Sequence, residues 1–545
     1  MKASTIGMIL SLLLVGVISA VSSAQTVRED VQAAQAQVLP DTFVQSAALP
    51  GVLPLKHVVM STGGFGDRLN SYAWSMTDFK GDLYVGTGRY VDTFGPMWEL
   101  IGGALFPGTR PPQLPDAPDV PFMQDWTTTR VNGIPVVTDE TKFNAWKASS
   151  YAEIWKYSHD TRAWSRVYQA HDTPSFVLNA TTHKMTYTVS SAMGFRKMDV
   201  VGNSAGDQIM YAFVGGFTLA LPGANAPLIL ASKDGTNWVG VPTPAGMGQQ
   251  TRSSAVFNGK LYVGVDHASS TVHTSVWCTD VDIDDPTNVS WEKVLDFDAK
   301  DATNSGIVSL ASFNGKLYVG TQNVGGFQVW CGSGTPGIDD WQKVVSDGGV
   351  DKYNAWAGTM KVFNNYLYVG SISLPYLGGS SAFKGFDILR IDTKNKWQLM
   401  VGGGTPASPV PGYEKVRSLS GQKSGFGNQM NFYCWSMEVF RNKLYVGTFD
   451  ATLFLRYLKD YTGPLPSQLQ TIKALAPILV ACDGGADLWE TTNGTSWTND
   501  TKTGYSHADN YGLRTMEVFD NSLILGFNNP FDGCEIHALA PSLFR

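Results

Sequence analysis

The sequence predicts an all-β protein built from seven repeats of four strands, and three observations lead to that prediction. The composition suits many short strands joined by turns, with 57 glycines, 12% aromatic residues and only 16% charged residues. A hairpin phrase recurs along the chain, nearly unchanged as "FNGKLYVGV" at 257–265 and "FNGKLYVGT" at 313–321. A second phrase, in which a polar turn ends on a tryptophan, follows the first six copies.

Residues 1–24 are expected to form a secretory signal peptide. Lys2 precedes the apolar run "IGMILSLLLVGVISAV", and the small residues Ser22 and Ala24 suit cleavage near Ala24. An uncleaved membrane anchor is the alternative, but the run is shorter than the roughly 20 residues that span a bilayer. We therefore expect a secreted protein, extracellular or periplasmic, with no transmembrane segment after cleavage. Residues 25–52 match no repeat and are expected to be a leader or linker.

The repeated phrase predicts a β-hairpin, because each copy consists of an apolar strand, a turn with Gly, Asn or Asp, and a second apolar strand. The anchor residues Phe257, Phe313 and Phe363 give a base period of 50 to 56 residues, and inserts lengthen other repeats. The seven copies lie at 75–89, 197–216, 253–266, 309–322, 359–372, 436–449 and 515–528.

The second phrase predicts two more strands in each repeat, one on either side of a polar turn. The tryptophans at the turn exits are Trp164, Trp238, Trp291, Trp341, Trp397 and Trp497. Four strands in a period of this length are typical of the blades of a β-propeller.

The seventh repeat lacks its fourth strand, because the chain ends shortly after "GCEIHALAP". The segment "LPLKHVVM" at 53–60 fits the missing strand. We therefore predict a single seven-bladed β-propeller over 53–545, with four-stranded antiparallel blades and an N-terminal strand that completes the last blade and closes the ring. Two smaller propellers or a solenoid would not explain the complementary half-blades at the two ends.

Two polar turns, "SKDGTNW" at 232–238 and "TTNGTSW" at 491–497, resemble the Asp-box hairpin of sialidase-like (BNR) propellers. Asp234 occupies the aspartate position of the first turn, whereas Asn493 replaces it in the second. The whole repeat also resembles an uncharacterised type of secreted microbial propeller. These resemblances imply a fold and not a chemistry.

The inserts are expected to carry the function. The two largest, 91–150 and 451–482, fall on the face opposite the tight hairpin turns, together with 171–190, 373–384 and 402–428, and long loops are more often functional than not. We expect this face to bind a glycan or a surface protein. The alternatives are an extracellular polysaccharide hydrolase or lyase, and a structural subunit of a cell-surface layer.

The 91–150 insert supplies the first candidate site residues. Trp98, Trp126 and Trp146 could stack on sugar rings and Arg110 could orient a polar group, although the aromatic residues could instead pack the insert onto the scaffold. Weak catalytic candidates follow from the two carboxyl groups that glycoside hydrolysis requires, but no spacing selects a pair. They are Asp125, Asp139 and Glu140.

A spaced pair of polar residues opens five of the repeats and supplies the second set. Asn70, Asn431, His507 and Asn510 are ligand-binding candidates near the centre of the ring. Weak metal candidates are Asp67, Asp301 and Asp351, because a ring of oxygens could hold Ca²⁺. The alternative is a repeated Asx turn that satisfies local amides. No cofactor is required. Arg196, Arg252 and Arg514 share one strand position, which favours a structural role.

Charge and cysteine content exclude several function classes. The net charge of −7 is scattered along the chain, which argues against nucleic-acid binding. The five cysteines do not form a dense disulfide framework and are expected to be buried thiols, although Cys482 and Cys534 could pair. Four sequons, at Asn179, Asn288, Asn493 and Asn499, matter only where exported proteins are glycosylated.

Overall fold

The computed structural model describes residues 54–89, 130–131, 134–176, 178–179, 181–182, 186–215, 228–244, 246–247, 251–266, 274–374, 384–404, 408–460, 470, 473–474, 476–477 and 484–541. The expected signal peptide and leader lie outside these residues. So do most of the 91–150 insert and much of the 451–482 insert.

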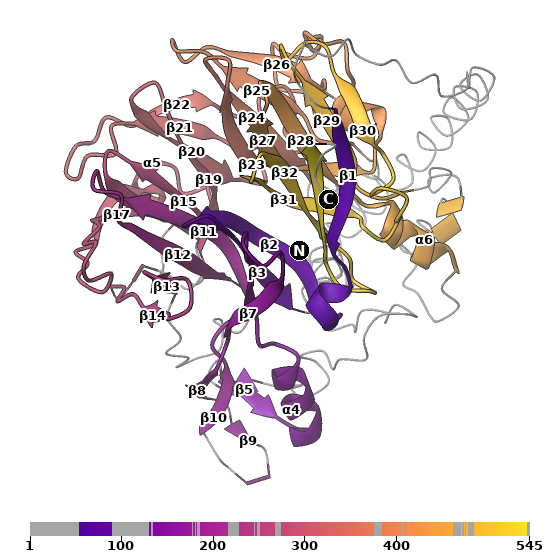
Figure 1. Ribbon diagram of the computed structural model, residues 1–545. Helices are drawn as coiled ribbons and strands as arrows, with labels where there is room; N and C mark the ends of the chain where they lie inside the picture. Colours follow the sequence, from indigo (N-terminus) through magenta and orange to yellow (C-terminus); the bar gives the residue numbers. More distant parts are fainter. Residues whose placement is uncertain are drawn as a thin grey trace, which may run out of the picture.

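The described strands form seven antiparallel units of four strands, numbered here in chain order (Figure 1). Unit 1 contains β2 (Asn70–Phe79), β3 (Asp82–Arg89), β6 (Glu153–Tyr157) and β7 (Trp164–Gln169). Unit 2 contains β11 (Gly194–Gly202), β12 (Gln208–Gly215), β13 (Ile229–Ser232) and β14 (Val239–Gly240). Unit 3 contains β15 (Thr251–Phe257), β16 (Lys260–Val265), β17 (Ser275–Asp280) and β18 (Glu292–Asp296).

The remaining units repeat this order. Unit 4 contains β19 (Gly306–Phe313), β20 (Lys316–Gln322), β21 (Val329–Gly332) and β22 (Gln342–Val345). Unit 5 contains β23 (Asn354–Phe363), β24 (Tyr366–Ser373), β25 (Ile388–Ile391) and β26 (Trp397–Val401). Unit 6 contains β27 (Asn431–Phe440), β28 (Lys443–Asp450), β29 (Leu488–Thr491) and β30 (Thr498–Thr501). Unit 7 contains β31 (Gly512–Phe519), β32 (Ser522–Asn528), β33 (Glu535–Pro541) and β1 (Leu55–Ser61).

The predicted hairpins are confirmed by the pairing of the first two strands in every unit. In the "FNGK" copies, Asn258 and Gly259 adopt φ values of 50° and 75°, as Asn314 and Gly315 do at 48° and 70°. A two-residue turn with positive φ at both positions matches the twist of the flanking strands, and Asn–Gly adopts it at low cost. The tight turns therefore follow from the local sequence.

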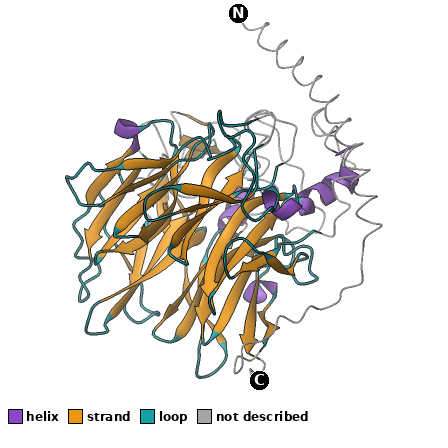
Figure 2. Cartoon of the chain, turned by 90° about the horizontal axis from the view of Figure 1, so that it is seen from above, coloured by secondary structure: helices purple, strands orange, loops and turns teal. Residues whose placement is uncertain are grey.

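The units pack face to face, and this arrangement is that of a β-propeller. The innermost strand of each unit contacts that of the next, in the order β2, β11, β15, β19, β23, β27 and β31, and β31 also contacts β2. The tyrosine of the "LYVG" phrase is at most 2% exposed in the five units that carry it, because both faces of the second strand are covered. The strands dominate the molecule, and the described helices lie at its margins (Figure 2).

Strand β1 joins the last unit, as the sequence predicted for 53–60. It pairs antiparallel with β33, from Leu55 opposite Pro541 to Ser61 opposite Ile536. In Figure 1 this indigo strand lies beside the yellow C-terminal strands. Units 7 and 1 also share a hydrophobic core, in which Met76 and Val85 pack with Phe519 and Ile536.

A small module projects from unit 1 at the bottom of Figure 1. It unites the end of the 91–150 insert with the 171–190 insert, which the sequence analysis treated separately. Its elements are β4 (Arg130–Val131), β5 (Ile134–Val137), α4 (Glu140–Ala148), β8 (Asp172–Phe176), β9 (Leu178–Asn179) and β10 (Thr186–Ser190). β5 pairs in parallel with β9, β8 pairs with β10, and α4 packs on β10. We call residues 130–150 and 172–190 the satellite module.

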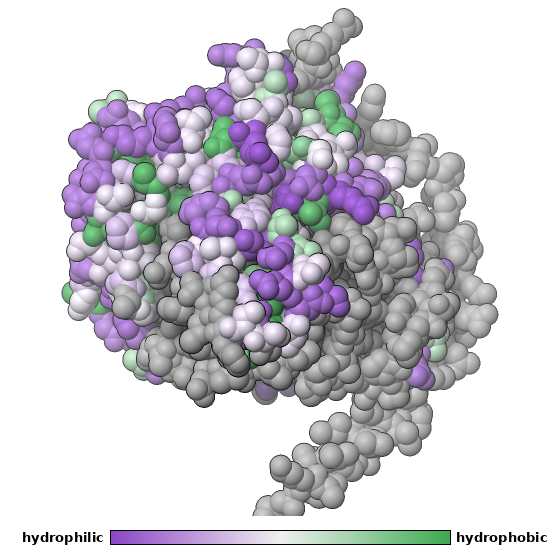
Figure 3. Space-filling model, turned by 90° about the horizontal axis from the view of Figure 1, so that it is seen from below, coloured by the Kyte–Doolittle hydropathy of each residue, from purple (hydrophilic) through white to green (hydrophobic). Residues whose placement is uncertain are grey.

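Other short helices cap the strands: η1 (Gly63–Gly66), α5 (Phe297–Lys300), η5 (Ser424–Gly427) and α6 (Thr452–Asp460). No helix in the described ranges has the length and apolar character needed to cross a bilayer. Cys278, Cys331, Cys434 and Cys534 are buried free thiols, as expected, and Cys482 lies outside the described residues. On the face drawn in Figure 3, apolar residues are scattered among hydrophilic ones.

Candidate functional site

Three arginines converge on the axis that the innermost strands surround. Arg196 is the third residue of β11, Arg252 the second of β15 and Arg514 the third of β31. Burial lowers the pKa of Arg196 well below its usual range, and repulsion from Arg252 and Arg514 lowers it further. Burial also lowers the pKa of Arg514 to about 10. Three guanidinium groups from separate units are therefore close enough to repel one another.

Each of these arginines lies over the face of a tryptophan from another unit. The distances from the guanidinium carbon to the ring centroid are 4.8 Å for Arg196 and Trp74, 5.0 Å for Arg252 and Trp356, and 5.6 Å for Arg514 and Trp435. At these distances each guanidinium is attracted to the electron-rich face of its ring. We call these six residues the axial cluster.

Glycines of neighbouring strands position two of the tryptophans. A Cβ atom on Gly194 would lie 2.0 Å from the ring of Trp74, and one on Gly512 would lie 2.1 Å from the ring of Trp435. Any side chain at these glycines would displace the rings, so the repeated glycine near the start of the inner strand is needed for the stacking.

The axial cluster carries excess positive charge. Arg252 pairs with Asp266, but within the described residues no acidic side chain pairs with Arg196 or Arg514. The Nε atom of Arg196 is buried and has no hydrogen-bond partner there. Arg196 and Arg514 are both partly exposed, and the planar donors of a guanidinium match a carboxylate. The arrangement can therefore bind an anionic group, with the tryptophan rings beside it.

The lysines that follow along the inner strands are paired with acids, which makes the arginine layer distinctive. Lys197 pairs with Asp199 at 3.0 Å, and Lys361 pairs with Glu438 at 2.5 Å. Burial raises the pKa of Glu517 to about 8, with a further contribution from the charge of Glu438. No comparable pairing neutralises Arg196 and Arg514 among the residues that the structure describes.

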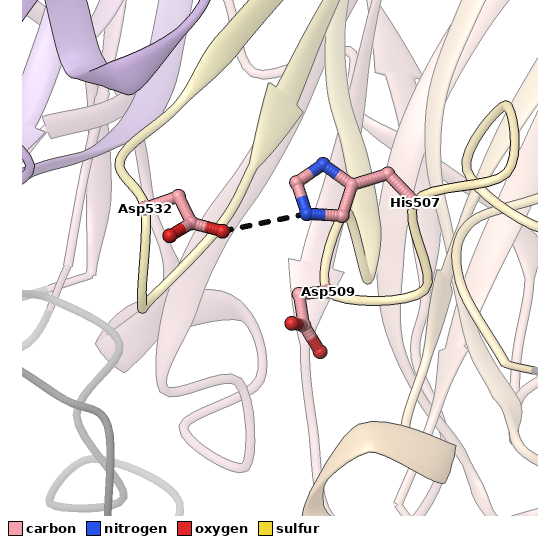
Figure 4. Close-up of side chains that lie close together, drawn as sticks. All are labelled: His507, Asp509 and Asp532. Carbon is pink, nitrogen blue, oxygen red and sulfur yellow. Dashed lines mark ion pairs between the residues drawn. The ribbon is translucent and has the colours of Figure 1, made fainter.

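A second polar group lies at the same end of unit 7 (Figure 4). His507 comes from the loop that leads into β31, and Asp532 from the loop between β32 and β33. The Nε2 atom of His507 lies 3.4 Å from a carboxylate oxygen of Asp532. Ligand atoms of His507, Asp509 and Asp532 all lie within 4.8 Å of one another, so these side chains could hold a metal ion. We call these three residues the rim cluster.

Neighbouring charges already engage the rim cluster. Asp509 pairs with Arg456 of α6 at 3.6 Å, and the Nδ1 atom of His507 lies 3.1 Å from Glu535. The hydrogen bond between His507 and Glu535 raises the pKa of His507, and the negative charge of Glu535 raises that pKa further. Burial of Glu535 acts the other way, but the hydrogen bonds from His507, His537 and Asn510 hold its pKa well below its usual range.

No protein-family model matches the chain, and no curated protein matches its sequence. Solved structures with a similar arrangement include Raptor from Chaetomium thermophilum, at 8% identity and a TM-score of 0.40 over 90% of this chain and 29% of that one. Trypanosoma rangeli sialidase matches at 9% identity with a TM-score of 0.29, over 87% of this chain and 55% of the sialidase chain. An arabinoxylan arabinofuranohydrolase of glycoside hydrolase family 43 from Bacillus subtilis matches at 10% identity with a TM-score of 0.28. The match covers 72% of this chain and 79% of the hydrolase chain. This chain spans less than a third of the Raptor chain.

The asparagines predicted to bind a ligand lie in the core instead. Asn70, Asn431 and Asn510 are 0% exposed. Each donates from Nδ2 to a carbonyl six residues earlier and to an acid that opens the third strand, namely Glu153, Asp487 and Glu535 respectively. These asparagines hold together the strands of their own units, as the alternative of a repeated structural turn expects, and a ligand-binding role for them stays a prediction. His507 remains half-exposed at the rim.

The predicted metal aspartates are engaged within their own units. Asp67 pairs with Arg89 at 2.7 Å, and Asp301 pairs with Lys343 at 2.9 Å. Asp351 is 0% exposed and accepts a hydrogen bond from the backbone of Tyr353. These contacts tie each aspartate to its own unit, and the shared Ca²⁺ ring stays a prediction.

The satellite module accounts for the candidates of the first insert that fall on described residues. Trp146 is 4% exposed and packs with Phe143, Tyr187 and Val189, so it stabilises the module and is not available to stack on a sugar. Asp139 caps α4 by accepting from the backbone N–H of Lys142, whereas Glu140 is exposed in the first turn. Trp98, Arg110, Trp126 and Asp125 lie outside the described residues.

Sequence reasoning missed the acids that open the third strands and assigned the axial arginines a structural role. A signal was present, because "AEIW", "ADLW" and "CEIH" place an acid two residues before a Trp or His. Trp155 and Trp489 donate from Nε1 to Glu153 and Asp487, and His537 contacts Glu535. Convergence of arginines from three distant repeats could not be inferred from spacing alone.

Proposed function

We propose that the protein is an exported seven-bladed β-propeller that binds an acidic glycan, through a carboxylate held by the axial cluster. The observation that carries this proposal is the convergence of three tryptophan-stacked arginines, of which two have no acidic partner among the described residues. Carboxylate recognition by guanidinium groups and stacking of rings on sugar faces would act together at such a site.

Several contacts support a closed ring of seven blades around this site. β31 contacts β2, and the turns of neighbouring units bond one another at the opposite end. Lys80 donates to Lys233, Asn314 to Thr393 and Asn364 to Thr492, while Arg162 of unit 1 pairs with Asp520 of unit 7. The turn at 232–238 supports the Asp-box resemblance, because Asp234 accepts from the backbone N–H groups of Thr236 and Asn237.

The position of the axial cluster supports access from the face with the long connections. Its arginines lie within three residues of the start of their strands, at the end where α6, the satellite module and the rim cluster leave the units. We call this end the loop face. The tight turns lie at the other end. A ligand would therefore meet the rim cluster before the axial cluster.

Direct binding tests the proposal. The probes are polygalacturonate, a polymer of carboxylate-bearing sugars, and dextran as a neutral control, each titrated into the purified protein at two salt concentrations. We expect binding to polygalacturonate that weakens with salt, because exposed charge interactions are screened. Arg514→Gln and Arg196→Gln should each weaken it by roughly 10- to 100-fold, the range for losing a hydrogen bond to a charged group.

The matched control is Arg390→Gln. Arg390 also lies over an aromatic ring, that of Tyr366 at 4.2 Å, but on the third strand of unit 5, away from the axis. The Arg390→Gln variant should bind polygalacturonate as the wild type does. Equal loss in all three variants, or equal binding of dextran, would refute the proposal. Release of reducing sugar that Glu140→Gln abolishes would favour the polysaccharide hydrolase instead.

A further inference from the structure

Each unit with a buried acid at the start of its third strand also supplies a positive group beside it, except unit 6. In unit 1 the acid is Glu153, and Arg89 lies 3.9 Å from it. In unit 5 it is Asp387, and Lys384 lies 3.0 Å from it. In unit 7 it is Glu535, flanked by two histidines. A buried carboxylate needs such a partner, because a lone buried charge is strongly unfavourable.

Unit 6 places a second acid where unit 1 has its arginine. Asp450 is the last residue of β28, opposite Asn431, just as Arg89 is the last residue of β3, opposite Asn70. Asp450 is 1% exposed and Asp487, the third-strand acid, is 3% exposed. No cationic side chain of the described residues pairs with either acid. Two cations lie near enough for their charge to act on these acids without pairing with them: Arg456, which pairs with Asp509, and Lys502, which lies over the ring of Trp489 at 4.9 Å.

Asn431 lies between these two acids and has an unused oxygen. Its Nδ2 donates to Asp487 at 2.9 Å, and its Oδ1 is buried with no hydrogen-bond donor among the described residues. In the four other units that have this asparagine, units 1, 4, 5 and 7, its oxygen accepts a hydrogen bond. Arg89 donates to Asn70 at 3.2 Å, Lys384 to Asn354 at 2.9 Å, Asn323 to Asn304 at 3.3 Å and Asn529 to Asn510 at 3.2 Å. The 0% exposure of Asn431 makes an empty oxygen costly.

We propose that unit 6 binds a hard divalent cation, Ca²⁺ or Mg²⁺, between the carboxylates of Asp450 and Asp487 and the Oδ1 atom of Asn431. The ion takes the place of the guanidinium of unit 1 and the ammonium of unit 5. The donor set is all oxygen, which selects hard cations over zinc or copper.

Local hydrogen bonds prepare the two carboxylates for an ion. Asp450 accepts from the backbone N–H of Thr452 at 2.7 Å and from Nδ2 of Asn428 at 2.9 Å. The carboxylate of Asp487 accepts two hydrogen bonds from described residues, from Asn431 and Trp489, and both end on Oδ2. These contacts fix the orientation of both groups and leave Asp487 Oδ1 available.

The site also has a structural consequence, because Thr452 begins α6. An ion between β28, β27 and β29 would tie the start of the 451–482 insert to the blade. It therefore acts on the loop face without contacting the axial arginines, and it does not depend on the proposed glycan.

The first test is metal binding by the purified full chain after treatment with EDTA. Tb³⁺ serves as a luminescent substitute for Ca²⁺, because Trp489 lies beside the site and can sensitise its emission. We expect saturable emission that Ca²⁺ displaces, and a rise in Tm when Ca²⁺ or Mg²⁺ is added. Absence of both responses at millimolar metal would overturn the proposal.

Variants then locate the ion. Asp487→Asn and Asp450→Asn should lose the metal-dependent rise in Tm, whereas the matched pair Asp509→Asn and Asp532→Asn, in the rim cluster, should retain it. Asp450→Arg restores the arrangement of unit 1 and should give a protein whose Tm no longer responds to metal. Loss of the response in the rim variants but not at Asp487 would overturn the assignment. Polygalacturonate binding is measured separately in EDTA, so that a failure of the cation site can be told from a failure of the proposed glycan binding.

Discussion

A single position, the last residue of the second strand, differs most informatively among the units. It is Arg89 in unit 1, Ser373 in unit 5 and Asp450 in unit 6. Each of these residues lies opposite the asparagine that begins the first strand of its own unit. Because the surrounding backbone repeats, the change of residue type at this position alters charge while the geometry stays the same. In unit 6 a second acid, Asp450, therefore lies near enough to Asp487 for its charge to act on it.

The pH dependence of stability should report on Asp487. Burial, and then the charge of Asp450, raise the pKa of Asp487 to about 7. Without metal, the folded protein therefore binds more protons than the unfolded chain between about pH 4 and pH 7, and stability falls as the pH rises through this window. The loss is at most about 4 kcal/mol, for a shift of about three units. Denaturant unfolding of the wild type and of Asp487→Asn in EDTA, at pH 5 and pH 8, measures it.

The comparison between the two proteins isolates Asp487 from other titrating groups. The wild type should lose more stability between the two pH values than Asp487→Asn does, and saturating Ca²⁺ at pH 8 should remove most of that difference. Parallel changes in the two proteins would contradict the raised pKa.

Single residues were the least predictable feature of the sequence. The spaced Asp and Asn residues stood out because they repeat, and repetition is what a structural turn produces. Asn70 and Asn510 accordingly lie in the core. The departures from the repeat were the better signal: Asp450 ends "YVGTFD" where Arg89 ends "YVGTGR".

At the scale of elements, the turns between the third and fourth strands depend on their glycines. Gly494 has a φ of +77°, and a Cβ atom there would lie 2.1 Å from the hydroxyl of Tyr368 in the neighbouring unit. We expect Gly494→Ala to destabilise the protein by about 2–6 kcal/mol, since backbone strain and overpacking each cost about 1–3 kcal/mol. Gly259→Ala, at a φ of +75° with no atom within 4 Å, should cost only the strain. Equal losses of unfolding free energy in both variants would show that the contact with Tyr368 is unimportant.

The satellite module should unfold locally when its own core is disturbed. Phe143 is 1% exposed and packs against Trp146 and Tyr187. Phe143→Ala should cost about 3–5 kcal/mol within the module. Hydrogen exchange should accelerate at 134–150 and 186–190 and stay unchanged in β27 and β28. Uniform acceleration across the blades would instead mean that the module and the propeller unfold together.

Hairpins were predictable and the satellite module was not, for one physical reason. A hairpin such as 257–265 is specified by residues a few positions apart, with Asn258 and Gly259 setting the turn. The module needs β5 to pair with β9, about 40 residues away, and this pairing has no periodic signal. The sequence therefore located both inserts but could not show that they form one structure.

For the whole molecule, β1 protects an edge that would otherwise be open. Without it, β33 would present unpaired backbone groups, which promote association between chains. A protein that starts at Thr62 should have a lower Tm and form oligomers, whereas one that starts at Pro54 should resemble the full chain. Light scattering and thermal unfolding test this, and addition of a peptide covering 54–61 should partly restore the monomer. A monomeric, equally stable protein starting at Thr62 would contradict the role of β1.

The pairing of β1 with β33 also sets an order of events during synthesis. The Nε2 atom of His57 lies 3.0 Å from the Nδ1 atom of His537 in the folded protein, although the two residues are 480 positions apart in the chain. A ribosome makes β1 well before its partner β33, because the two strands are far apart in the chain. Unit 7 can therefore be completed only after β33 and every unit between the two strands have left the ribosome, and after they have crossed the membrane if the protein is exported. Folding of this protein should accordingly be slow, as is usual when the decisive contacts are distant in sequence, and β1 should be the segment that chaperones or premature self-association reach first.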